Sequence, residues 1–153
     1  MDALEGLDTA ALLAVLDIPK DGRMLTFGAA SAGPGMKIAA RREDVLIVIC
    51  DTTSEVTRAV SDQSLTDHLH NIIVGDSPAG PLVDRALCVN SLHSIAPPEL
   101  TMLRTAMLPG GYAIFLEESV SAGEIAEKLK AFGFTVADPL DGALQGWQVV
   151  RAR

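Results

Sequence analysis

A few polar residues and glycines of this sequence stand where they could bind a ligand. Asp51 and Asp76 each follow an apolar run, and a carboxylate at the end of such a run can accept hydrogen bonds from both hydroxyls of a ribose. Gly33 and Gly35 follow another apolar run, and glycines let a backbone approach a ligand without interference from a Cβ atom. Together these residues predict one nucleoside-shaped cleft.

Each of these features also has a purely structural interpretation. Asp51 can cap the helix that follows it, with Thr52, Thr53 and Ser54 as rival caps. The two glycines can simply belong to a turn, because a G-x-G pattern is common by chance. Neither interpretation is excluded by the local sequence.

Apolar runs that alternate with helical patterns must position these residues. Helices are predicted at 3–16, 99–107 and 121–132, the last opening with the S-x-x-E capping-box pattern at Ser121. Strands are predicted at 23–29, 45–50, 71–75, 85–90, 112–116, 134–137 and 147–151. The run at 45–50 is apolar throughout, as expected of a strand that is covered on both faces.

This alternation predicts an α/β fold with a mostly parallel sheet of about seven strands, one of them antiparallel. In such sheets ligands bind beyond the carboxyl ends of the strands, where the strand order reverses. The length of 153 residues predicts a single domain, with an N-terminal helix at 1–18 and the sheet at 23–153.

Composition narrows the class of partner. The chain has 20 acidic and 12 basic residues, and its net charge of −8 argues against binding to nucleic acid. Only 4% of the residues are aromatic, which leaves few platforms for stacking bases. No apolar run reaches the ~20 residues that span a bilayer, and the N-terminus lacks the pattern of a signal peptide. We therefore expect a soluble cytoplasmic protein without a membrane partner.

The cysteines and two of the histidines carry weaker signals. Cys50 and Cys88 sit inside apolar runs without metal-binding spacing, which predicts two reduced thiols in the core. His68 and His70 lie two residues apart without further ligands, so we expect exposed histidines and no metal site there.

Five motifs in order resemble those of the class I S-adenosylmethionine-dependent methyltransferases, particularly their small-molecule group. They are SAGPG at 31–35, DTTSE at 51–55, GDS at 75–77, VDRALCVNSLH at 83–93 and LPGG at 108–111. The resemblance covers roughly residues 20–153. It implies a Rossmann-like, mostly parallel sheet of seven strands, with one antiparallel strand near the edge and helices on both faces.

The resemblance also implies a cofactor, S-adenosylmethionine, and a set of contacts. The loop at 31–35 would pass under the methionine part, Asp51 would bind the ribose, and Asp76 with the Ser77 backbone would bind the adenine. Asn90 to His93 would line the mouth where donor meets acceptor. The implied cofactor-binding residues are Ala29, Ser31, Gly33, Gly35, Asp51, Thr52, Asp76, Ser77 and Asn90.

The sequence departs from the family in the first motif. Ala29 stands where the family usually has an acid, and Ser31 where it has the first glycine. Loss of the acid removes a partner for the ammonium group of the cofactor and predicts weak or lost binding. Placing Gly28 first in the motif puts Thr26 at the position of the acid, so neither alignment supplies one.

A second departure is the missing cover over the substrate. Residues 117–120 join the fifth predicted strand almost directly to the helix at Ser121, without an inserted segment. An open site fits a large acceptor, a lid supplied by a protein partner or a second copy of the chain, or no reaction at all.

His93 is the candidate catalytic residue, because an ordinary histidine titrates near neutral pH and can act as a general base. The alternative is that His93 only braces its loop. Asn90 is followed by Ser91 and Leu92, so the N-P-P-Y signature of methyltransferases acting on nucleic-acid amines is absent from the sequence.

Two functions of different classes remain open. The first is an S-adenosylmethionine-dependent methyltransferase that acts on a small molecule or a protein. The second is a methyltransferase-like domain without catalysis that acts as a protein-interaction or regulatory module. A nicotinamide-dependent oxidoreductase is a weaker third, because the third fingerprint glycine would fall at Ile38 and no substrate domain remains.

Overall fold

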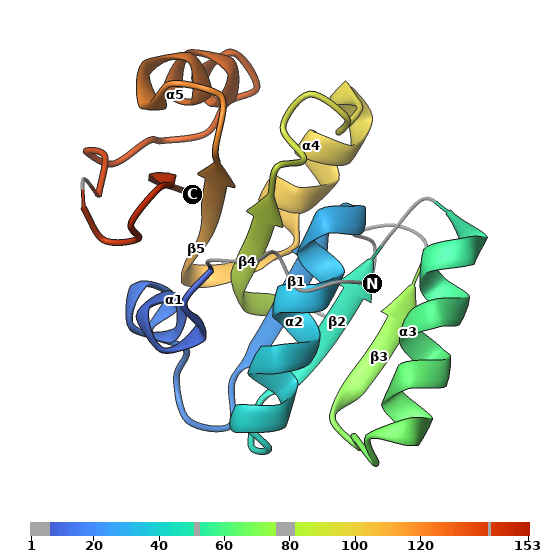
Figure 1. The fold of residues 1–153 in the computed structure, drawn as a ribbon. Helices are drawn as coiled ribbons and strands as arrows, with labels where there is room; N and C mark the ends of the chain where they lie inside the picture. Colours follow the sequence, from blue (N-terminus) through green and yellow to red (C-terminus); the bar gives the residue numbers. More distant parts are fainter. Residues whose placement is uncertain (1–6, 51–52, 76–81, 141) are drawn as a thin grey trace.

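The computed structural model describes residues 7–50, 53–75, 82–140 and 142–153, which form a six-stranded sheet with helices on both faces (Figure 1). The strand order is β3-β2-β1-β4-β5-β6, parallel except for the antiparallel pair of β5 and β6. The strands are β1 Arg23–Phe27, β2 Leu46–Cys50, β3 Ile72–Gly75, β4 Val83–Val89, β5 Met107–Glu117 and β6 Gln148–Ala152. The order reverses between β1 and β4, so a crevice is expected above their carboxyl ends.

The expectation of seven strands is wrong for the described residues. The first of the two expected closing strands forms only an isolated bridge between Val136 and Ala152. A backbone hydrogen bond from Thr135 N to Arg153 O, 2.7 Å long, flanks this bridge. Ala137 N also donates to Arg151 O at 2.9 Å, and Leu140 N to Val149 O at 3.0 Å, but Pro139 between them has no N–H to donate and interrupts the pairing.

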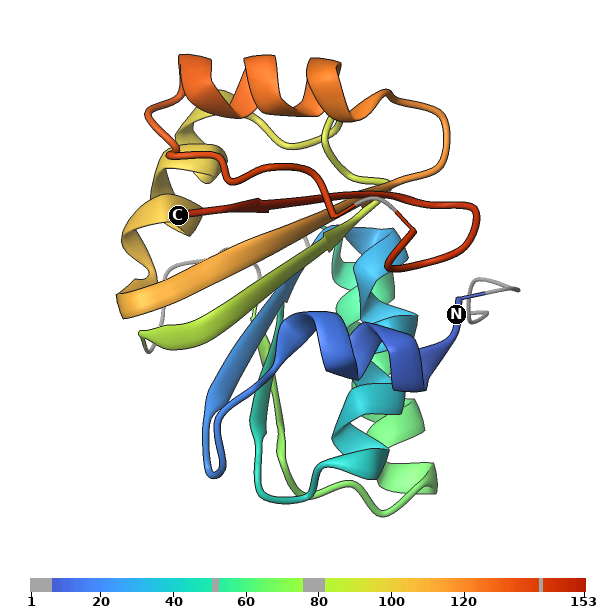
Figure 2. The same cartoon turned by 90° about the vertical axis from the view of Figure 1, so that its left-hand side faces the viewer.

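In the described part of the chain, five helices cover the two faces of the sheet. They are α1 Thr9–Leu16, α2 Ala29–Arg41, α3 Ser54–Thr66, α4 Pro97–Thr105 and α5 Ala122–Ala131. Helices α1, α2 and α3 pack on one face, and α4 and α5 on the other (Figure 2). The α/β class and the helices on both faces are therefore confirmed.

The all-apolar run of β2 is buried on both faces, as predicted. Ile47 and Ile49 belong to the core under α1, α2 and α3, whereas Val48 and Cys50 belong to the core under α4 and α5. Successive side chains of a strand point to opposite faces, so a central strand with two covered faces needs apolar residues throughout.

The junction of β1 and α2 differs from the prediction. β1 ends at Phe27, two residues before the expected end, and α2 begins at Ala29. The expected glycine loop at 31–35 is therefore part of a helix. A Cβ atom added to Gly35 would lie 2.9 Å from Cγ2 of Thr26, so this glycine lets α2 pack closely on β1.

Other ends of elements follow local capping. Asp8 caps α1 by accepting the N–H of Ala10 at 2.9 Å, and Ser121 caps α5 by accepting the N–H of Glu124 at 3.2 Å, as the S-x-x-E pattern predicts. Thr53, one of the rival caps, is the N-cap of α3.

Cys50 and Cys88 are buried and are not joined in a disulfide, which confirms the prediction of two core thiols. Burial is the main cause that raises the pKa of the Cys88 thiol well above its ordinary value. Across the described ranges, no helix has both the length and the apolar character needed to cross a membrane.

Candidate functional site

The carboxyl ends of the central strands form one row. Phe27, the last residue of β1, pairs in register with Cys50 of β2 and with Cys88 of β4, and Cys50 pairs with Gly75 at the end of β3. Because these strands are parallel, the segments that leave them emerge at the same edge of the sheet.

Four of the predicted cofactor residues follow this row but lie outside the described residues. Asp51 and Thr52 come directly after β2, and Asp76 and Ser77 come directly after β3. Their assignment to the ribose and the adenine stays a prediction.

Gly28 forms the turn from β1 into α2. Its φ of 95° lies in the region that favours glycine, and its N–H donates to Cys50 O at 3.2 Å. A Cβ atom here would collide with the Ser91 hydroxyl and lie 2.7 Å from the Ser91 Cβ. The turn is therefore in close contact with the loop that follows β4.

The first turn of α2 places backbone N–H groups at this edge. Gly28 is the N-cap and provides no side chain to cap the helix. Within the described ranges, no acceptor is recorded for the N–H groups of Ala29 and Ala30, and Ala29 is exposed. Such N–H groups at the start of a helix can bind an anionic group.

Ser31 joins the ends of β1 and β4 instead of facing a ligand. Its hydroxyl is buried, donates to Phe27 O at 2.7 Å and accepts the N–H of Val89 at 2.8 Å. Gly33 and Gly35 are buried in α2 as well. The turn at the carboxyl edge is therefore formed at Gly28, and the residues at 31–35 lie within α2.

Asn90 opens the loop after β4 and is tied to the end of β5. Its φ of 47° is left-handed, a conformation that asparagine tolerates better than most residues. The Asn90 side chain donates to Glu118 Oε1 at 2.8 Å and accepts the Glu118 N–H at 3.1 Å. Sequence reasoning missed Glu118; the signal for it is its place just after an apolar run.

Glu117, at the end of β5, also stabilises the loop after β4. It is only 5% exposed, and its Oε1 accepts the N–H of Leu92 at 3.0 Å, while Lys128 Nζ donates to Leu92 O at 2.6 Å. Burial raises the pKa of Glu117, although the Leu92 N–H and the nearby charges of His93 and Lys128 oppose the shift. His93 itself is exposed on this loop.

The structure therefore brings Gly28, Asn90, Ser91 and Glu118 to one edge, with His93 on the same loop. The arrangement offers free amide donors, an amide side chain, an exposed carboxylate and an imidazole. These groups suit a polar ligand that carries a positive and a negative charge. The imidazole of His93 would lie near such a ligand as a proton acceptor.

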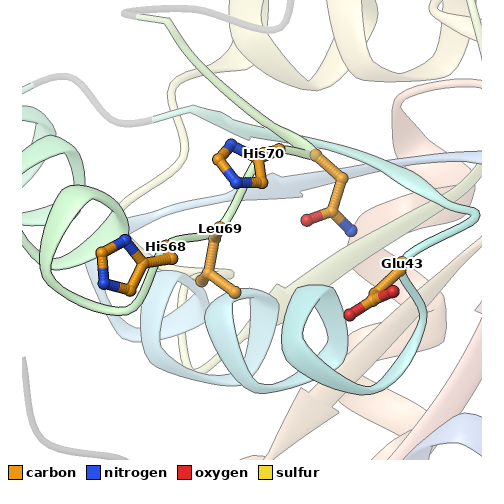
Figure 3. Close-up of a pocket in the computed structure, with 5 residues that line it drawn as sticks. Glu43, His68, Leu69 and His70 are labelled. Atoms are coloured by element: carbon orange, nitrogen blue, oxygen red, sulfur yellow. The ribbon is translucent and has the colours of Figure 1, made fainter.

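His68 and His70 lie elsewhere, in a hollow at the amino end of β3 (Figure 3). Both histidines are exposed, as predicted, and Figure 3 shows their side chains standing apart from each other and from Glu43. Among the residues that the structure covers, no group of three His, Cys, Asp or Glu side chains could hold a metal ion.

No family model matches the sequence. No curated protein matches it either. Solved structures do match. A SAM-dependent methyltransferase from Aquifex aeolicus has a TM-score of 0.83 at 17% identity, over 97% of this chain and 90% of that chain.

Two further structures are similar at equally low identity. Precorrin-6y C5,15-methyltransferase from Geobacter metallireducens GS-15 has a TM-score of 0.72 at 14% identity, over 95% of this chain and 86% of that chain. The cyclase SpnF has a TM-score of 0.74 at 17% identity, over 91% of this chain and 61% of that chain. The fold is thus that of the class I SAM-dependent methyltransferases, a fold that also occurs in a protein named as a cyclase.

Proposed function

We propose that this chain, which has the fold of the class I methyltransferases, binds S-adenosylmethionine at the carboxyl edge of its sheet and transfers the methyl group to an acceptor other than nucleic acid. The observation that carries the proposal is the contact of the Gly28 turn with the loop after β4, at the same edge of the sheet as the ends of β2 and β3. A small molecule or a protein is the acceptor, given the net charge of −8.

The residues at this edge fit the cofactor. The N–H groups of Ala29 and Ala30 would bind the methionine carboxylate, at the positive end of α2. Asp51, with Thr52 beside it, would bind the ribose, and Asp76 with Ser77 the adenine. When bound, S-adenosylmethionine supplies a methyl group on a sulfonium, which a nucleophile can displace in line.

Residues of this chain would then position the methyl acceptor and remove a proton from it. Holding donor and nucleophile in line is the main contribution of the protein to such a displacement. Asn90 and Glu117 fix the loop that carries His93, and the imidazole of His93 would accept the proton of the acceptor. A protein partner or a second copy of the chain would supply the cover over this open edge.

The ammonium group of the cofactor needs a partner other than the one expected from the sequence. Ala29 lies in α2, past the end of β1, and Thr26, two residues before Gly28, is fully buried. Glu118 is exposed at the same edge and is held there by Asn90, so we assign the ammonium to its carboxylate. Because Glu118 is exposed to water and already accepts a hydrogen bond from Asn90, it replaces the expected acid only in part, and we expect weak binding with a Kd of roughly tens of micromolar or above.

Thr26 also favours the second candidate function, a domain that has kept the fold and lost catalysis. A buried threonine at this place cannot take the role of a carboxylate toward a ligand. Such a domain would act through its surface as an interaction or regulatory module.

Calorimetry with S-adenosylmethionine and S-adenosylhomocysteine separates the two candidates. We expect both ligands to bind, Asp51→Asn to weaken both by about tenfold, and Asp62→Asn, on the exposed side of α3, to leave them unchanged. Absence of binding to the folded protein would contradict the methyltransferase and favour the interaction module.

Catalysis is tested by the formation of S-adenosylhomocysteine in the presence of small nucleophiles such as phenols, thiols and amines. His93→Gln should lower the rate without changing cofactor affinity, whereas His68→Gln, at the other end of the sheet, should change neither. An equal effect of the two substitutions would exclude His93 as the base.

A further inference from the structure

Away from the carboxyl edge, a cleft lies between α1 and the segment that leads into β6. It encloses about 520 Å³, within the size range of small-molecule sites. Its lining residues are Ala11, Ala14, Val15, Asp17, Tyr112, Leu140, Ala143 and Arg151. Figures 1 and 2 show α1 and the C-terminal segment on the same side of β5.

This cleft is separate from the candidate active site. Tyr112 pairs with Arg85 near the start of β4, whereas Leu116 O accepts the N–H of Asn90 at the carboxyl edge. Tyr112 lies five residues before Glu117 on the same strand, which corresponds to about 16 Å.

Two arginines flank the ring of Tyr112, and they come from the strands on either side of β5. The guanidinium carbon of Arg85 lies 3.9 Å from the ring centroid, and that of Arg151 lies 5.1 Å from it. Arg151 lines the cleft together with Tyr112, whereas Arg85 contacts the Tyr112 ring without lining the cleft.

Only one of the two guanidinium groups is satisfied by the fold. Arg85 donates to Leu16 O at 2.6 Å and Asp17 O at 2.9 Å, at the negative C-terminal end of α1. For Arg151, by contrast, no hydrogen-bond acceptor and no carboxylate partner are recorded within the described ranges. Its fork of donors borders the cleft and matches the geometry of a carboxylate.

The other residues that line the cleft indicate which kind of carboxylate ligand would fit. Ala11, Ala14, Leu140 and Ala143 are apolar walls, and the Tyr112 ring forms an aromatic surface. Asp17 also lines the cleft, and its carboxylate disfavours any negative charge beyond the one carboxylate that Arg151 can pair. We propose that this cleft binds a monocarboxylate with an apolar body, with Arg151 as the anchor of the carboxylate.

The single tyrosine of the chain gives a direct readout, because protein labelled with 3-fluorotyrosine has one fluorine resonance, that of Tyr112. The probe is benzoate, and benzamide is its uncharged counterpart. We expect benzoate to shift the resonance saturably and benzamide not to do so. The readout at Tyr112 does not depend on whether S-adenosylmethionine binds at the other edge.

Variants test the anchor and the walls separately. Arg151→Gln should weaken benzoate binding by about tenfold or more, because it removes a charged hydrogen-bonding partner. Arg153→Gln, the same change at an exposed arginine of the C-terminus, should leave binding unchanged. Ala14→Leu should block the cleft from α1 and abolish the shift while Arg151 remains.

Three results would overturn the proposal. They are a saturable shift with benzamide equal to that with benzoate, unchanged benzoate affinity in folded Arg151→Gln protein, and the absence of a saturable benzoate shift in the unmodified protein. Thermal unfolding of each variant establishes that it is folded.

Discussion

At the scale of single residues, Thr26 is a buried threonine whose hydroxyl has no hydrogen-bond partner in the described part of the chain. Its Cγ2 and Oγ1 atoms face Gly35 of α2, at the packed interface of helix and sheet. A buried hydroxyl without a partner lowers stability, because it loses its hydrogen bonds to water on folding.

We predict that Thr26→Val raises the free energy of unfolding by about 1 kcal/mol, because valine keeps the shape and removes the unsatisfied hydroxyl. Urea denaturation measures the change. Thr26→Ala is the control, since it removes the methyl group as well and should be less stable than the valine variant. A valine variant less stable than the unmodified protein would show that the hydroxyl has a partner.

The raised pKa of Glu117 makes the free energy of unfolding depend on pH. Its pKa is raised in the folded protein, chiefly by burial, so the folded state holds the proton at pH values where the unfolded chain has lost it. The stability contributed by the protonated form is lost as pH rises from the unfolded pKa through the folded pKa. Glu117→Gln keeps an acceptor for the Leu92 N–H without the charge.

We therefore expect Glu117→Gln to gain stability relative to the unmodified protein as pH rises through this window. The measurement is the free energy of unfolding as a function of pH. Glu118→Gln is the matched control, because that neighbouring side chain is exposed and should not show the effect. A difference between Glu117→Gln and the unmodified protein that does not vary with pH would contradict the prediction.

At the scale of elements, the junction of β1, α2 and the loop after β4 depends on one glycine. Gly28 has a positive φ and lies against Ser91. A side chain there would therefore cost both backbone strain and a steric collision with Ser91. Gly110 has a similar φ of 82°, but an added Cβ atom would have nothing within 4 Å. A substitution at Gly110 therefore measures the cost of the backbone strain alone.

We predict that Gly110→Ala costs about 1 kcal/mol of stability and that Gly28→Ala costs at least about 2 kcal/mol more. Adding Ser91→Gly to Gly28→Ala should recover most of the difference, because it removes the collision but not the strained φ. Chemical denaturation of the three variants measures both terms. Equal costs at Gly28 and Gly110 would mean that Ser91 moves aside freely.

At the scale of the whole molecule, the charge of −8 acts on any ligand that approaches. S-adenosylmethionine carries a sulfonium charge that S-adenosylhomocysteine lacks, so the field of the protein favours the first over the second. The two ligands are otherwise nearly the same shape, which makes one the control for the other.

We predict that the preference for S-adenosylmethionine over S-adenosylhomocysteine falls as salt rises. From about 0.01 M to about 1 M ionic strength the screening length shortens from roughly 30 Å to roughly 3 Å. Calorimetry at both ionic strengths gives the ratio of the two Kd values. A ratio that stays constant would place the sulfonium beyond the influence of the net charge.

Elements that depend on local patterns could be predicted from the sequence alone. The apolar run of β2 predicted a strand buried on both faces, and S-x-x-E predicted the Ser121 cap, because periodicity and capping involve only residues close in the chain. The order of motifs also predicted the fold. The roles of Asp51 and Asp76 stay predictions.

Which glycine forms the turn at the candidate site depends on contacts between segments that are distant in the chain. The residues at 31–35 look like a loop in the sequence, yet Gly35 packs on Thr26 within α2, and Gly28 forms the turn against Ser91. The pairing of Asn90 with Glu118 was likewise invisible, because the two residues are 28 positions apart. Such contacts form only when the strands pair in the sheet, and a local sequence pattern does not predict which side chains then come into contact.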